Sequence, residues 1–216
     1  MALLIISIIV FLPTLFFTKS LSGKTVGGSS GQGEYTENLK YELNVDKPGY
    51  ILTEFNGGTE EVIIPPTYKG LPVFKIGEGA FFNNDKITSV VIPDSVTIIG
   101  DRAFFDCGSL TSVTIPDSVT SIGYDAFISC TSLTSVTIGN GVTSIGWCVF
   151  ENCSSLTRIT IPDSVTSIGE SAFRSCSSLT TINYKGSKEQ WDAISKGYDW
   201  NYGAGSYTIN YNYVEN

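Results

Sequence analysis

Residues 110–123 read LTSVTIPDSVTSIG, and residues 133–146 and 156–169 read LTSVTIGNGVTSIG and LTRITIPDSVTSIG. The same pattern therefore returns every 23 residues. One column of phenylalanines and one of glycines keep this interval: Phe81, Phe104, Phe127, Phe150 and Phe173, and Gly77, Gly100, Gly123, Gly146 and Gly169. A fixed period of this length predicts a solenoid, in which similar units stack on one another.

Each unit has a simple physical interpretation. Apolar residues alternate in the segment 112–115 and predict a short strand, whose serine and threonine face away from the core. Pro116 ends the strand and Asp117 supplies a turn, after which a second short extended piece directs Ile122 inward. One unit buries too little apolar surface to offset its own ordering, so the units must stack and need caps at both ends.

The repeated pattern L-x-x-V-x-I-P-x-S-V-T-S-I-G-x-x-A-F-x-x-C resembles the BspA-like leucine-rich repeats. The resemblance covers residues 62–178, and the segments 40–65 and 182–195 are similar to the usual flanks of that family. It implies a β-rich solenoid: a right-handed coil of parallel short strands with an N-terminal β cap and a C-terminal helix-plus-strand cap. It also implies adhesion or protein binding, and it supplies no catalytic residues.

We expect five regions along the chain. These are a signal peptide or membrane anchor (1–22), a flexible linker (23–39), an N-terminal cap (40–61), a repeat array of five units, four of them 23 residues long (62–178), and a C-terminal cap (179–216).

The N-terminal region leaves two alternatives open. Residues 2–17 are apolar and uncharged, and Ser20-Leu21-Ser22 offers a small-x-small cleavage site. No lysine or arginine precedes the apolar run, whereas Lys19 and Lys24 follow it, which favours an uncleaved anchor with the repeats inside the cell. Because the resemblance favours export, we expect a secreted or cell-surface protein and keep the uncleaved anchor as the alternative.

The composition excludes several function classes. The net charge is −8 and no basic patch exists, so nucleic acid is not an expected partner, and membrane contact is expected only through the N-terminal segment. The chain has no histidine, which removes Ser-His and Cys-His nucleophiles and His-ligated metals. Asp94, Asp117 and Asp163 each occupy the same turn of their own unit and are interpreted as turn residues rather than unlike catalytic carboxylates. We expect no enzymatic activity, no cofactor and no metal.

The five cysteines are not expected to form disulfides. Cys107, Cys130, Cys153 and Cys176 recur at one position of the unit and predict a ladder of small buried groups. Cys148 falls outside this ladder and is expected to be partly exposed.

The candidate binding surface is the outward row of the repeated strands. We predict a partner-binding face made of Ser112, Thr114, Ser135, Thr137, Arg158 and Thr160. The row extends to Ser89, Val91, Thr181 and Asn183. Arg158 interrupts the hydroxyl row and is the best single candidate for a specific contact. The alternative is a solvated β-face whose threonines serve strand propensity.

The C-terminal region has two interpretations. Ser187 and Gln190 form a capping-box pattern that predicts a short helix, and the alternation in residues 207–213 predicts a last strand. Its aromatic residues, Tyr198, Trp200, Tyr202, Tyr207, Tyr211 and Tyr213, would either cap the array or stack on sugar rings. The expected function is therefore a non-enzymatic secreted or surface module that binds a protein, for example a host matrix or surface protein. The alternative is a carbohydrate-binding module that uses this region or the strand face.

Overall fold

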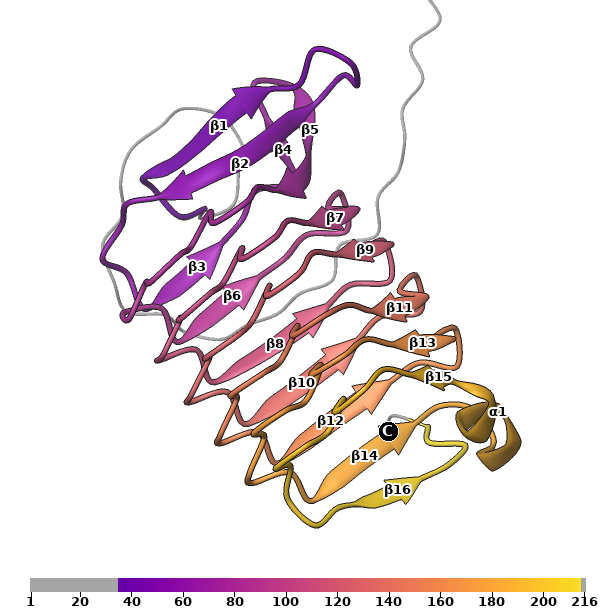
Figure 1. Cartoon of the computed structure of the whole chain (residues 1–216). Coiled ribbons are helices and arrows are strands. Elements are labelled where there is room, and N and C mark those ends of the chain that lie inside the picture. The colour runs from indigo at the N-terminus through magenta and orange to yellow at the C-terminus, as the bar shows by residue number, and fades with distance from the viewer. Residues whose placement is uncertain (1–34, 215–216) are drawn as a thin grey trace, which may run out of the picture. The chain divides into compact units, whose positions relative to one another are not determined.

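The computed structural model describes residues 35–214, which lie in one compact unit, Gly33–Asn216 (Figure 1). The proposed signal peptide or anchor and residues 23–34 of the proposed linker lie outside the described residues. Within residues 35–214, no helix has the length and apolar character needed to cross a bilayer.

The largest element is a parallel sheet of seven strands, in the order β16-β14-β12-β10-β8-β6-β3. Its strands are β3 (Glu61–Ile63), β6 (Ser89–Val91), β8 (Ser112–Ile115), β10 (Ser135–Ile138), β12 (Arg158–Ile161), β14 (Thr181–Tyr184) and β16 (Thr208–Asn210). Equivalent residues of successive units lie opposite one another, so Val136 pairs with both Val113 and Ile159. The predicted in-register stack of parallel strands is confirmed.

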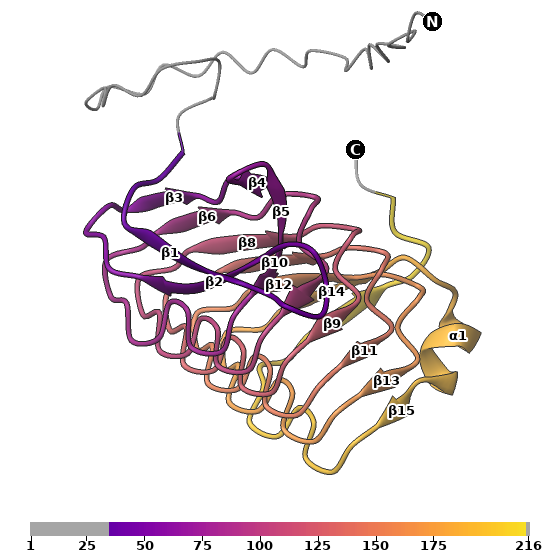
Figure 2. The ribbon, with the colours of Figure 1, turned by 90° about the horizontal axis from the view of Figure 1, so that it is seen from above.

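A second series of strands, all but the first only two residues long, follows the same coil and is called here the short-strand ladder (Figure 2). It contains β5 (Leu71–Ile76), β7 (Ile98–Ile99), β9 (Ser121–Ile122), β11 (Ser144–Ile145), β13 (Ser167–Ile168) and β15 (Ser195–Lys196). The strands β5, β7 and β9 belong to one sheet, whereas β11, β13 and β15 form a separate sheet. The ladder is therefore interrupted between β9 and β11.

An antiparallel hairpin caps the N-terminal end of the short-strand ladder. It consists of β1 (Leu39–Leu43) and β2 (Tyr50–Phe55), and β2 pairs in parallel with β5. The two-residue strand β4 (Thr67–Tyr68) pairs with the start of β5. The ring of Tyr41 stacks on that of Tyr68 with centroids 4.3 Å apart, and burial raises the pKa of Tyr41 well above its usual value.

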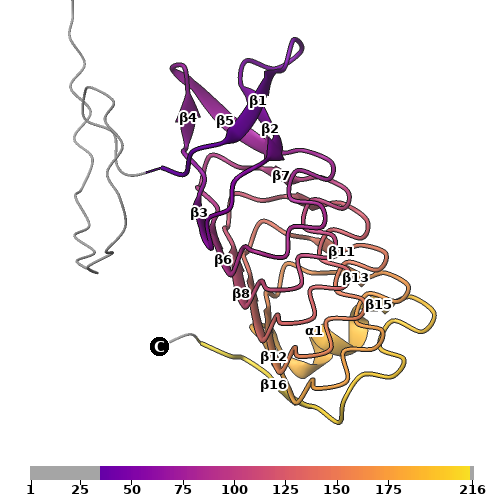
Figure 3. The same cartoon turned by 90° about the vertical axis from the view of Figure 1, so that its left-hand side faces the viewer.

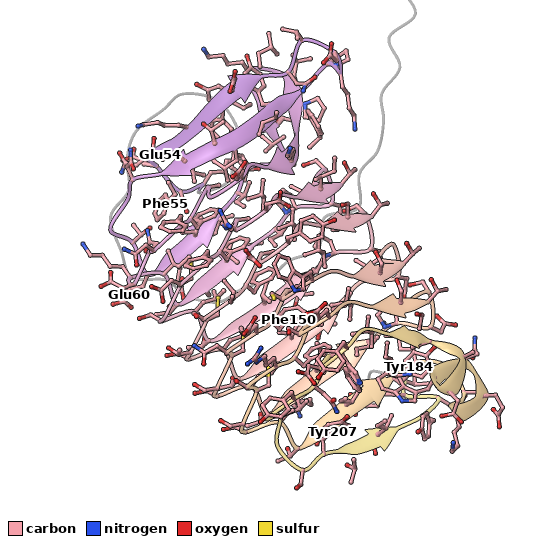
Figure 4. The ribbon with its side chains drawn as sticks, viewed as in Figure 1. Glu54, Phe55, Glu60, Phe150, Tyr184 and Tyr207 are labelled. Carbon is pink, nitrogen blue, oxygen red and sulfur yellow. The ribbon has the colours of Figure 1, made fainter. Side chains whose placement is uncertain are left out.

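The core is built from columns of identical residues. The rings of Phe81 and Phe104 stack with centroids 4.8 Å apart, and the stacking continues at 5.0, 5.5 and 5.5 Å to Phe173. Phe55 begins the column with a tilted contact to Phe81 at 5.6 Å, and Figure 4 labels Phe55 and Phe150 within it. Aromatic pairs contribute about 0.5–1.5 kcal/mol each beyond area burial, so identical rings at one position favour a single register.

The C-terminal region closes the other end of the stack. The helix α1 (Lys188–Ala193) begins with the predicted capping box, because the side chains of Ser187 and Gln190 accept from each other's backbone N–H. The ring of Trp200 packs edge-on against Phe173 at 6.1 Å, which places it at the end of the phenylalanine column. Tyr207 packs against Trp200 at 6.4 Å, and β16 adds the last strand of the sheet (Figure 4).

Candidate functional site

A shallow groove of about 780 Å³ crosses the outward side of β6, β8 and β10, which we call the strand face. This sheet lies on the left side of Figure 3. The exposed hydroxyls of Ser112 and Thr114 line the groove at its centre. Val91 is 55% exposed and provides an apolar contact. The predicted row of small polar side chains therefore coincides with a surface depression.

The groove ends at the turns that follow the strands. Asp94, Asp117 and Asn140 occupy equivalent turn positions and line it, and Lys185 after β14 lines it too. The backbone N–H and side-chain amide of Asn140 donate to the carboxylate of Asp117 at 2.7 and 3.3 Å. The groove thus combines hydroxyls, carboxylates, an amide, an ammonium group and one apolar contact.

Two kinds of hydroxyl row must be distinguished on this surface. The hydroxyls of Thr111 and Thr134 each donate to the backbone carbonyl of the equivalent threonine in the preceding unit at 2.9 Å. These threonines stabilise the stack. The hydroxyls of Ser112, Thr114 and Ser135 make no hydrogen bond to another residue within 35–214, so they can bind an external group.

The predicted row is not accessible along its whole length. Thr160 is only 4% exposed and Asn183 only 3%, so the expectation that both are free surface residues is wrong. The side chain of Asn210 donates to Asn183 Oδ1 at 2.9 Å, and after β16 the chain returns to β14, where Tyr213 N donates to Tyr184 O at 3.0 Å. This return lies beside the end of β14, at the C-terminal end of the strand face. Thr160 lies beside Asn183 in the register and is buried with it.

Arg158 remains exposed at the amino-terminal end of β12. It does not line the groove, whose lining ends with β10 and Lys185. The predicted row therefore has an accessible part on β8 and β10, which contains Ser112, Thr114, Ser135 and Thr137, and two buried members, Thr160 and Asn183.

The cysteine ladder is confirmed as a column of free, buried thiols. Each thiol donates to the backbone carbonyl of the phenylalanine one unit earlier, as Cys130 does to Phe104 O at 3.2 Å. Burial raises the pKa of Cys107 to about 12 and that of Cys153 well above its usual value. These thiols are structural and stay protonated at neutral pH.

The expectation for Cys148 is wrong. Its side chain is buried, at 6% exposure, and burial followed by the neighbouring Glu151 raises the pKa of its thiol to about 12. Cys148 adopts a left-handed backbone conformation with φ of 53°, as Asp125 does one unit earlier with φ of 58°. Cys148 therefore lies in a loop, but its side chain is buried against the neighbouring loops.

The C-terminal aromatic residues divide into two groups. Trp200 and Tyr207 pack within the cap, and Asn201 Nδ2 donates to the Tyr207 hydroxyl at 2.7 Å. Tyr198 and Tyr202 are 78% and 62% exposed. Among the described residues, no group of three His, Cys, Asp or Glu side chains is placed to hold a metal ion.

A second groove, of about 590 Å³, lies on the short-strand ladder and was not anticipated from the sequence. Tyr124 lines this groove, and the exposed ring of Trp147 in the next unit stands beside that of Tyr124, with centroids 6.4 Å apart. The signal was present in the repeat alignment: the residue after each conserved glycine varies, and it is aromatic in these two units. A comparison of variable positions would have found it.

Comparison with known proteins agrees with this architecture. A family model described as "BspA type Leucine rich repeat region" matches residues 74–194 with six copies. A leucine-rich repeat protein of T. pallidum is 34% identical, with 69% of this chain and 71% of that protein covered and a TM-score of 0.67. A leucine-rich cell surface protein of Faecalibacterium prausnitzii is 32% identical, with 84% of this chain and 55% of that protein covered and a TM-score of 0.54.

The pneumococcal vaccine antigen PcpA is 22% identical, with 70% of this chain and 49% of that protein covered and a TM-score of 0.53. This similarity supports the fold alone. The chain therefore spans only about half the length of some of these proteins. No curated protein sequence matches the chain. Neither the family model nor these similar structures indicates an enzyme.

Proposed function

Because the chain belongs to the BspA-type leucine-rich repeat family, we propose that it is a non-enzymatic secreted or cell-surface protein whose strand face binds a protein partner. A surface location is supported by the 32% identical protein of Faecalibacterium prausnitzii, which is described as a cell surface protein. An adhesive role would follow if the partner lies on another cell or in a matrix.

The observation that carries the proposal is the groove on the strand face. Ser112 and Thr114 project free hydroxyls into it from β8, and Asp117 borders it. Rigid strands hold these groups at fixed spacing, so a partner meets a preorganised surface. Hydroxyls and carboxylates recognise the backbone and polar side chains of another protein, and Val91 adds an apolar contact.

The composition of the groove predicts how tight this binding is. Among the described residues no aromatic side chain lines it, so they provide no central anchor of the kind that dominates many protein interfaces. Each strand offers a similar short set of small groups, and the binding energy is therefore spread over β6, β8 and β10. Strong attachment then requires several copies of the molecule acting together.

The test begins by identifying the partner through a photo-crosslinking residue placed at position 114 of the full chain. A matched protein with the crosslinker at Thr131, an exposed loop position, is the control. The protein captured from solubilised matrix or cell-surface material by the first and not the second is then purified. Its affinity is measured by surface plasmon resonance against the wild type and the variants.

The informative variant is Ser112→Arg with Thr114→Arg, which fills the groove and leaves the inward side chains of β8, Val113 and Ile115, unchanged. The matched control is Thr131→Arg with Ser177→Arg, which adds the same charge at exposed loop positions. We expect the groove variant to lose at least roughly tenfold in affinity, because crowding an interface centre costs about 1–3 kcal/mol or more. Equal affinity of both variants for the captured partner would remove the strand face as the binding site.

Carbohydrate binding stays the alternative. Its support is confined to the exposed Tyr198 and Tyr202, because Trp200 and Tyr207 are used by the cap. A glycan array probed with the wild type and with Tyr198→Ala plus Tyr202→Ala decides this case. A glycan signal that disappears in the variant would favour the alternative over protein binding.

A further inference from the structure

A row of exposed side chains runs along the short-strand ladder at the position after each conserved glycine. Four successive units place Asp101, Tyr124, Trp147 and Glu170 there, and we call these residues the acid–aromatic row. Their backbone carbonyls accept in turn from residues of the preceding unit at 3.0, 2.9, 3.2 and 3.1 Å, which shows that they occupy equivalent places in the stack. With strands roughly 4.8 Å apart, the row extends about 14 Å from Asp101 to Glu170.

The two aromatic rings form a corner that is open to solvent. Tyr124 is 59% exposed and Trp147 is 50% exposed, and their planes meet at 69°. Exposing two large aromatic side chains beside each other is unfavourable unless a ligand covers them. An electron-rich indole face attracts a cation within about 6 Å of its centroid.

The charges around this corner are negative. Asp101 precedes Tyr124 in the row and Glu170 follows Trp147, and neither carboxylate forms an ion pair within the described residues. Two cations on neighbouring positions are engaged elsewhere: Arg102 Nε lies 3.3 Å from Asp125 Oδ2, and Lys196 Nζ donates to the backbone carbonyls of Trp191 and Ile194. A cation bound on the rings would thus have an unpaired carboxylate on each side.

The floor of the second groove also has spare hydrogen-bonding capacity. Gly123, Gly169 and Gly197 each donate to an isoleucine carbonyl of the preceding unit at 2.7–2.8 Å. Among the described residues, the equivalent bond between Gly146 and Ile122 is absent, because the ladder is interrupted between β9 and β11. The groove lies across this interruption, and the hydroxyls of Ser121, Ser144 and Ser167 that line it can bond to the backbone of an extended peptide.

From this combination we propose that the acid–aromatic row binds an extended, positively charged segment of a partner protein. An arginine or lysine side chain lies against Trp147 and Tyr124, and further cationic side chains pair with Asp101 and Glu170. The groove floor, lined by Ser121, Ser144 and Ser167, accommodates the backbone of the segment. This surface is separate from the strand face, so the two sites can be occupied and tested independently.

The test uses the full chain and a fluorescently labelled peptide of alternating arginine and glycine, followed by anisotropy. A glutamate–glycine peptide of equal length and a neutral oligosaccharide are the comparison probes. We expect the arginine peptide to bind, the affinity to fall as salt is raised because the charges are solvent-exposed, and the glutamate peptide not to bind. Binding of the oligosaccharide in preference to the arginine peptide would overturn the proposal and assign the corner to sugar stacking.

Two sets of variants locate the binding. Tyr124→Ala with Trp147→Ala removes the rings, and we expect a loss of roughly tenfold in affinity. Asp101→Asn with Glu170→Gln removes two charges and keeps an acceptor for Tyr124 N, which donates to Asp101 Oδ1 at 2.9 Å. The matched charge control is Glu60→Gln with Asp85→Asn, two exposed acids away from the groove, and Phe82→Ala is the aromatic control.

The outcomes separate specific from general attraction. If both row variants weaken the arginine peptide and both controls leave it unchanged, the proposal stands. If the charge control weakens binding as much as the row variant, the peptide follows net charge alone and the proposal fails. Circular dichroism of each variant checks that the fold is kept, and the strand-face variant Ser112→Arg with Thr114→Arg should bind the arginine peptide as the wild type does.

Discussion

Two glycines at the same position of neighbouring units should respond in opposite ways to alanine. A Cβ atom at Gly169 would lie 2.7 Å from Gly146 C and 2.8 Å from Trp147 N, which are backbone atoms of the adjacent unit. A Cβ atom at Gly146 would meet nothing closer than 3.6 Å. The interruption between β9 and β11 accounts for this difference, because it widens the spacing at Gly146 and not at Gly169.

The magnitude follows from these contacts. Gly169→Ala must push apart two units and loosen the bond from Gly169 N to Ile145 O, now 2.7 Å. Overpacking costs about 1–3 kcal/mol and a lost hydrogen bond about 1 kcal/mol, so we expect a loss of about 2–4 kcal/mol. Gly146 has no positive φ, and Gly146→Ala should change stability by less than about 1 kcal/mol, in the stabilising direction.

The assay is thermal unfolding of the full chain with each single substitution, followed by circular dichroism. One kcal/mol corresponds to a Tm shift of about 2–4 °C at this size, so Gly169→Ala should lower Tm by about 4–16 °C. Gly146→Ala should leave Tm within a few degrees of the wild type. A similar fall in Tm for both variants would show that the ladder is continuous at Gly146 in solution and would refute the reasoning.

Three further predictions concern the thiols and the C-terminal cap. In the folded protein all five cysteines should be labelled slowly by a thiolate-specific reagent, with Cys148 labelled no faster than Cys153. Mass spectrometry after pulse labelling measures these rates, and rapid labelling of Cys148 alone would contradict its burial. Burial holds the pKa of Cys107 at about 12 in the folded protein, whereas an unfolded thiol ionises near about 8.5. The protonated thiol therefore contributes its full stabilisation below the unfolded pKa, and Tm should fall as pH rises from about 9 toward 12. A Tm that stays flat across this range would oppose the prediction. Ser187→Ala removes the capping-box acceptor and should lower the free energy of unfolding, measured in urea, by about 0.5–2 kcal/mol. Lys188→Ala removes only an exposed ion pair and should lower it by less than about 1 kcal/mol. The reverse order would contradict the assignment of the cap.

Much of the architecture could be predicted because a repeat specifies its own neighbours. The spacing of the Phe column placed one ring at the same position of each unit, and in the structure these rings stack with centroids 4.8–5.5 Å apart. The alternation in residues 112–115 and the capping box at Ser187 depend on contacts within a few residues. Local patterns of this kind are visible in the chain itself.

The accessible part of the strand face was only partly predictable. The alternation correctly placed Ser112 and Thr114 on the outward side, and both are exposed. The same reasoning made Thr160 an accessible member of the row, although it is 4% exposed. Thr160 pairs in the register with Asn183, and the side chain of Asn210 bonds to Asn183 across 27 positions, a separation that the 23-residue period does not contain.

The sequence by itself determined the register of the stack and the identity of the buried columns, because both depend on units that are adjacent in the chain. Only the tertiary structure decided that Cys148 is buried, that the short-strand ladder is interrupted beside Gly146, and that the rings of Tyr124 and Trp147 form an exposed corner. The physical reason is that accessibility and strand spacing depend on the sum of all contacts around a residue. A repeat pattern describes the average unit, whereas these sites arise where one unit departs from that average.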